Sequence, residues 1–140
     1  MPTSHENSPT SRRWWPTLAI AAFVIGFIAL AVALLPRGYS QDFSIIGKGG
    51  NVMVLVHDHN VVQSMDTMNA MNEVRDEYAG RVKFLVADKY VAEGAQFAQT
   101  YGVGSIGLVF FAPNGEVIRI LDTTQDAESL RKNLNRAFGP

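Results

Sequence analysis

Two histidines and three methionines surround one point of the sequence, where an apolar run passes into a helix-like run. His57 and His59 close the apolar run and share one face of a strand, because they lie two residues apart. The methionines follow at i, i+3 and i+6, on one face of a helix: Met65, Met68 and Met71. Thioether and imidazole ligands suit Cu(I), so a copper site is one hypothesis. The pattern favours core methionines beside a polar histidine rim, because methionine is an ordinary gap filler, and a histidine-linked pH response is a third alternative.

The composition excludes several kinds of site. The chain has 140 residues, a net charge of −1 and no cysteine. Disulfides, thiolate nucleophiles, zinc–thiolate sites and iron–sulfur ligation are therefore impossible. The near-neutral charge gives no electrostatic case for nucleic acid binding. The GKGG segment at 47–50 lacks the length of a phosphate-binding P-loop, so we expect no cofactor and identify no small-molecule substrate.

A long apolar run lies near the N-terminus. Residues 14–35 read WWPTLAIAAFVIGFIALAVALL and carry no charge. As a helix they would extend about 33 Å, enough to cross a hydrocarbon core of roughly 30 Å. Trp14 and Trp15 suit a membrane interface, and Pro36 ends the helix. A cleaved signal peptide is the alternative, but the run exceeds the roughly 7–15 residues of such a peptide's apolar core. We therefore predict a single-pass transmembrane helix over 14–35, in contact with the lipid bilayer.

The charges that flank this run predict its orientation. Arg12 and Arg13 precede it, and only Arg37 follows it. The positive-inside rule then places residues 1–13, which read as a polar, disordered tail, in the cytoplasm. The C-terminal domain would be periplasmic or otherwise extracytoplasmic.

Small residues recur along the same run. Ala22, Gly26, Ala29 and Ala33 lie at i, i+4, i+7 and i+11, which makes one stripe along a helix. Such a stripe permits close approach of another transmembrane helix. The alternative is that alanine is simply common in these helices.

The soluble part alternates between strand-like and helix-like segments after a short tether at 36–50. Expected strands cover 52–57, 82–88, 106–112 and 116–122, and expected helices cover 63–80, 92–103 and 126–138. The order β-α-β-α-β-β-α begins with a parallel pair and adds an antiparallel hairpin through the PNG turn at 113–115. The sequence thus predicts one α/β domain over 51–140, with a mixed four-stranded sheet and helices on both faces.

Two segments of this domain resemble the thioredoxin family. VRDEYAGRVKFLVAD, at 74–88, is similar to the end of the first core helix and the second core strand of thioredoxins. AQTYGVGSIGLVFFAPNGEVIRIL, at 98–121, is similar to their Tyr-Gly-Val-x-x-Ile-Pro-Thr segment and the Asn-Gly hairpin after it. The resemblance covers about residues 51–138 and implies a thioredoxin-like fold. With its anchor, the chain resembles the tethered thioredoxin-like proteins of bacterial inner membranes and thylakoids.

The resemblance also implies that the redox motif is lost. The family's Cys-x-x-Cys motif aligns with Val61, Val62, Gln63 and Ser64. Val61 stands at the attacking cysteine and has no nucleophilic atom. Ser64 stands at the resolving cysteine, and its hydroxyl cannot replace a thiolate without an activating base. Thiol–disulfide exchange by this chain is therefore chemically impossible.

The residues that support redox chemistry in the family are also replaced. Asn60 aligns with the tryptophan before the motif, and Leu55 aligns with the buried acid. Gly107 aligns with the cis-proline opposite the motif. A cis bond before a non-proline residue costs about 2.5–4 kcal/mol, so we expect a trans bond at Gly107.

These observations predict a non-catalytic, membrane-tethered thioredoxin-like interaction module. It would serve as an accessory or assembly subunit of a larger respiratory, photosynthetic or transport complex, with other membrane protein subunits as partners. Exposed apolar clusters mark interfaces, so the candidate contacts surround the degenerate motif. They are His57, His59, Asn60, Val61 and Val62.

Two alternatives remain at this point. One is an extracytoplasmic copper-handling protein that uses His57 and His59 with Met65, Met68 and Met71. The other is a thiol-free, peptide-binding chaperone, which would keep the substrate groove of a thioredoxin. Gly107 in place of the proline argues against an intact groove.

Overall fold

The computed structural model describes residues 14–35 and 38–140. The chain divides into two compact units between Gly38 and Tyr39, and each unit is described by itself. The expected tail at 1–13 lies outside the described residues, as do Pro36 and Arg37.

The first unit is a single apolar helix, α1, which runs from Trp15 to Leu34. Its 20 residues have a mean hydropathy of 2.7 and none is buried, so it is long and apolar enough to cross a membrane. Thr17 satisfies its hydroxyl within the first turn by donating to the carbonyl of Trp14 at 2.7 Å. Ala22 and Gly26, from the predicted small-residue stripe, line a shallow hollow on the helix surface. That this stripe packs against another helix stays a prediction.

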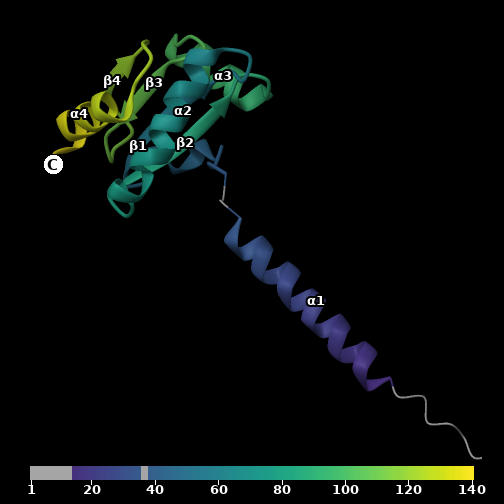
Figure 1. Cartoon of the computed structure of the whole chain (residues 1–140). Helices are drawn as coiled ribbons and strands as arrows, with labels where there is room; N and C mark the ends of the chain where they lie inside the picture. Colours follow the sequence, from purple (N-terminus) through teal and green to yellow (C-terminus); the bar gives the residue numbers. More distant parts are fainter. Residues whose placement is uncertain (1–13, 36–37) are drawn as a thin grey trace, which may run out of the picture. The chain divides into compact units, whose positions relative to one another are not determined.

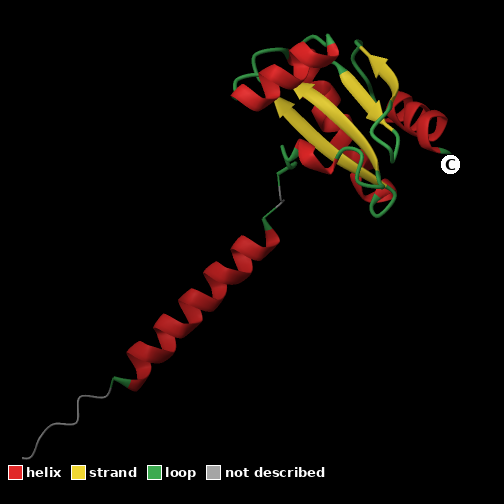
Figure 2. Cartoon of the chain, turned by 180° about the vertical axis from the view of Figure 1, so that it is seen from behind, coloured by secondary structure: helices red, strands yellow, loops and turns green. Residues whose placement is uncertain are grey.

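The second unit is built on a four-stranded sheet of order β2-β1-β3-β4 (Figures 1 and 2). Its strands are β1 (Asn51–His57), β2 (Val82–Asp88), β3 (Leu108–Phe111) and β4 (Val117–Leu121). β1 pairs in parallel with β2, and the β1–β3 and β3–β4 pairs are antiparallel. The predicted mixed four-stranded sheet is confirmed, and the architecture is compatible with a thioredoxin-like fold.

Helices cover both faces of this sheet. They are α2 (Val62–Val74), the 3-10 helix η2 (Arg75–Tyr78), α3 (Ala92–Tyr101) and α4 (Ala127–Phe138). α2 and α4 lie on one face and α3 lies on the other (Figures 1 and 2). The helix expected over 63–80 is shorter in the structure. Its α-helical part ends at Val74 and continues as the 3-10 helix η2, which is common at the ends of α-helices.

Two apolar clusters hold these layers together. The central strand β1 contributes residues to both clusters, because its side chains alternate between the two faces of the sheet. Met53 and Leu55 pack toward α2 and α4, whereas Val52, Val54 and Val56 pack toward α3. All five are at most 1% exposed, which fits the uninterrupted apolar run in the sequence.

The segment expected to be a tether is mostly part of the domain. Tyr39 packs against the α2–α4 cluster and donates to Asn72 Oδ1 at 2.7 Å. Ser40 forms a parallel bridge with Leu85 on β2. A short 3-10 helix, η1 (Phe43–Ile45), packs on the α3 cluster. The apolar side chains of this segment bury themselves on the sheet, so the boundary falls after Gly38 and not after Gly50.

Candidate functional site

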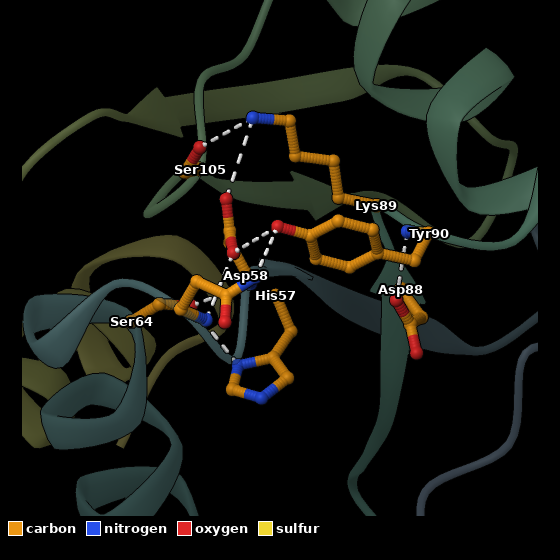
Figure 3. Close-up of polar contacts among 8 residues, drawn as sticks. His57, Asp58, Ser64, Asp88, Lys89, Tyr90 and Ser105 are labelled. Carbon is orange, nitrogen blue, oxygen red and sulfur yellow. Dashed lines mark hydrogen bonds and ion pairs between the residues drawn. The ribbon is translucent and has the colours of Figure 1, made fainter.

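The predicted site lies where β1 and β2 end. The parallel register sets His57 beside Asp88, so the residues that follow the two strands meet at one edge of the sheet. We call this edge the loop end; it comprises residues 57–62 and 88–91. Figure 3 shows its polar side chains, which converge on Asp58.

Asp58 is a buried carboxylate, only 4% exposed. Its Oδ1 accepts from the Asn60 amide at 3.0 Å and from the Tyr90 hydroxyl at 3.0 Å. Its Oδ2 faces the Lys89 ammonium at 3.4 Å. The Asn60 N–H bond lowers the pKa of Asp58, against the opposing effect of burial, and the Tyr90 and Lys89 contacts lower it further. Asp58 is therefore held as an anion.

Further bonds tie the donors of Asp58 to one another. Lys89 Nζ also donates to Ser105 Oγ at 3.0 Å, and Asn60 Nδ2 donates to the Tyr90 hydroxyl at 2.7 Å. The Tyr90 amide donates to Asp88 Oδ1 at 2.8 Å. The network thus joins the β1–α2 loop, the β2–α3 loop and the segment before β3 into one frame (Figure 3).

A serine and a histidine meet beside this network. Ser64 Oγ accepts from the Asp58 amide at 2.9 Å and lies 3.0 Å from His57 Nδ1. Burial lowers the pKa of His57, so the neutral imidazole is favoured and its Nδ1 can accept the serine proton. Ser64 therefore has the base that a nucleophile requires, but its side chain is 0% exposed and closed to any substrate. The contact between Ser64 and His57 thus ties the first turn of α2 to the end of β1.

Four large side chains at and around this network are exposed to solvent. Val62 is 67% exposed, Met65 50%, Tyr90 56% and Val91 39%. The His59 ring lies against Tyr90, with ring centroids 4.5 Å apart. Of the two valines proposed as contacts, Val61 is half-buried and only Val62 is open. We call the exposed set the contact surface: His59, Asn60, Val62, Met65, Tyr90 and Val91.

The three methionines do not form one sulfur-lined site. Met71 is 0% exposed within the core, and Met68 is partly buried against the same cluster. Met65 is the most exposed of the three, at 50%. His57 directs Nδ1 at Ser64 and His59 stacks on Tyr90. Two of the three thioethers that motivated the copper hypothesis are therefore core residues.

Of the three supporting positions that the resemblance implies, Leu55 and Gly107 lie in packed surroundings, whereas Asn60 is exposed. Leu55 is fully buried in the α2–α4 cluster. The Val56 amide donates to the Gly107 carbonyl oxygen at 2.8 Å, and every described peptide bond is trans. A Cβ added to Gly107 would lie 2.6 Å from the Cβ of Val103. Val103 therefore fills the space next to this position.

Sequence reasoning missed three members of the site. Lys89, Tyr90 and Ser105 all bond within the network, and none was singled out. A signal for the first two was present, because they directly follow a strand predicted to lie parallel to β1. Side chains after neighbouring parallel strands meet at the same edge, as Asp58 and Tyr90 do here.

Comparisons with known proteins support the fold and go no further. No family model and no curated protein matches the sequence. Among solved structures 129 chains match, so the fold is shared too widely to indicate one function. One of them, described as a malarial protein, is 11% identical and has a TM-score of 0.55, over 63% of this chain and 97% of that chain. At such low identity the likeness shows a small α/β domain with a mixed four-stranded sheet.

Proposed function

We propose that this chain is a membrane-tethered, thioredoxin-like interaction module without catalytic activity. The observation that carries the proposal is the buried Asp58 network, which fixes two loops while Val62, Met65 and Tyr90 stay exposed on these loops and on the first turns of α2. Preorganised loops bind at a lower entropic cost than mobile ones. Aromatic residues and methionine are enriched at the centres of protein interfaces.

The chemistry of the loop end supports a binding role over an enzymatic one. The chain holds no thiol, and the hydroxyl beside the His57 imidazole, that of Ser64, is buried. The polar groups of the site bond to one another, and none is a buried donor or acceptor without a partner in the described residues. Such a closed network stabilises a surface.

The setting of the module follows from the N-terminal helix. α1 anchors the chain in a membrane, with the N-terminus in the cytoplasm and the domain in the periplasm or an equivalent compartment. The module then acts as an accessory or assembly subunit of a larger membrane complex. Its partner is the extramembrane part of another subunit, because the contact surface belongs to the second unit alone.

Site-specific photo-crosslinking tests this proposal in the native membrane. A photoreactive residue replaces Val62, and a matched one replaces Ile120, which is 43% exposed on β4. We expect a discrete adduct of higher mass from position 62 and little from position 120. The variant Val62→Asp should lower co-purification of that adduct's partner at least fivefold, while Ile120→Asp leaves it unchanged. Equal labelling from both positions, or a free monomer after mild extraction, would contradict the proposal.

A further inference from the structure

The described chain joins the domain beside the middle of the edge strand β2. Ser40 bridges to Leu85 in parallel, and the Val86 amide donates to the Ser40 carbonyl at 3.1 Å. Residues before Ser40 therefore lead toward the start of β2 at Val82. The loop end begins at Asp88, six residues further along, or about 20 Å at 3.3 Å per residue.

Basic side chains gather at this entry point. Arg81 and Lys83 are exposed at the start of β2, and Arg75 lies over the Tyr39 ring at 4.5 Å. Arg75 and Lys83 line one shallow cleft of about 240 Å³, in which Asp76 is the acidic member. We call Arg75, Arg81 and Lys83 the entry face. Its net charge is positive even with Asp76 included.

The positive charge of the entry face is opposite in sign to the net charge of the whole domain. Without Arg12, Arg13, Arg37 and Glu6, the remaining residues carry nine basic and twelve acidic side chains, a net charge of −3. An acidic domain that concentrates three cations at its point of entry is suited to a negatively charged neighbour at that point.

The covalent chain limits how far this neighbour can be. Four residue steps separate Leu35, just after α1, from Tyr39, and they extend at most about 14 Å. The headgroup region on each side of a bilayer is about 5–7 Å thick. If α1 spans the membrane as proposed above, this chain length bounds the distance from the lipid surface to Tyr39, whose ring carries the Arg75 guanidinium.

We propose that the entry face docks on the anionic headgroups of the membrane that holds α1. Juxtamembrane lysines and arginines are attracted to such headgroups individually. Docking through Arg75, Arg81 and Lys83 turns the loop end away from the bilayer, toward the extramembrane part of a partner. The inference rests on the proposed membrane span, and it assigns the surface that orients the module.

The absence of cysteine makes this proposal directly measurable. The full chain carries a single fluorophore at Ala79→Cys, on the cleft of the entry face, or at Ala95→Cys on α3, in separate samples. Both chains are placed in nanodiscs of phosphatidylcholine, with or without phosphatidylglycerol, that contain a lipid bearing a headgroup quencher. We expect at least threefold stronger quenching at position 79 in the anionic discs, reversed by 0.5 M salt, and no lipid dependence at position 95.

Charge variants complete the test. Arg81→Gln and Lys83→Gln should each lower the ratio of docked to free domain about fivefold, and Lys132→Gln, an exposed residue of α4, should leave it unchanged. Equal quenching in both lipids from a chain inserted in the discs would overturn the inference but leave the proposed partner contact at Val62 intact. A chain that does not insert would overturn the inference and the proposed span together.

Discussion

The two ends of the sheet are stabilised in different ways. At the loop end, a buried carboxylate collects an amide, a hydroxyl and an ammonium from segments far apart in the sequence. At the entry end, Tyr39 is held by a hydrogen bond to Asn72 and by the Arg75 guanidinium. Buried polar groups lose much when one partner is removed, whereas exposed pairs lose little. Removing one contact should therefore cost the domain more stability at the loop end than at the entry end, where Tyr39 meets Asn72 and Arg75.

The largest difference between the ends should come from alanine at two glycines. A Cβ on Gly94 would overlap the backbone carbonyl oxygen of Asp88, at the loop end. A Cβ on Gly50, at the start of β1, would meet nothing within 4 Å. We expect Gly94→Ala to lower the free energy of unfolding by about 3 kcal/mol, because backbone cannot move aside cheaply. Gly50→Ala should change it by less than about 0.5 kcal/mol. Urea unfolding of the full chain in detergent micelles measures both, and similar losses would remove the contrast.

Loss of the central carboxylate should have the next largest effect. Asp58→Ala leaves the Asn60 amide, the Tyr90 hydroxyl and the Lys89 ammonium without their acceptor. We expect Tm to fall by about 10 °C. Asp76→Ala, at the exposed entry end, serves as the control and should shift Tm by no more than about 2 °C. The Tm of both variants is measured by thermal unfolding, with circular dichroism as the signal. A change of the same size in the two variants would mean that the network is not a stabilising frame.

A smaller effect is expected from removing one hydroxyl at each end. Tyr90→Phe deletes a donor to the buried Asp58 and an acceptor for Asn60. Tyr39→Phe deletes exposed contacts, among them the bond to Asn72. We expect losses of about 1.5 kcal/mol and about 0.5 kcal/mol in the free energy of unfolding. The reverse order, measured by chemical unfolding, would show that the entry end is the more firmly held.

The smallest effect should be a pH response confined to the loop end. Burial lowers the pKa of His57 below its ordinary value of 6.5, so the folded state disfavours the imidazolium. As the pH falls below about 6.5, the unfolded chain binds a proton that the folded chain does not, and stability is lost. Between pH 7.5 and pH 5.5 we expect Tm to fall by a few degrees. His57→Gln should flatten this dependence and His59→Gln should not; an unchanged slope in His57→Gln would assign the response elsewhere.

Patterns among neighbouring residues predicted the helices and strands, but they did not predict contacts between segments far apart in the sequence. β1 is recognised by its apolar run and α4 by the helical spacing of its apolar residues. The Tyr39–Gly50 segment has no such period, and its burial depends on what the sheet presents to it. The bonds of Asp58 to Lys89 and Tyr90 join residues 31 and 32 positions apart, and one sequence does not record which charges meet.

Gly107 is a position at which the packing of the domain leaves no room for a side chain. Any side chain at this position would collide with Val103, whose Cβ lies 2.6 Å from where the new Cβ would be. Val103 is itself part of the apolar cluster under α3, so shrinking it opens a cavity before anything is gained. Placing any larger residue at position 107 therefore requires a second substitution at Val103, and either change alone lowers stability. The two positions can change only as a pair.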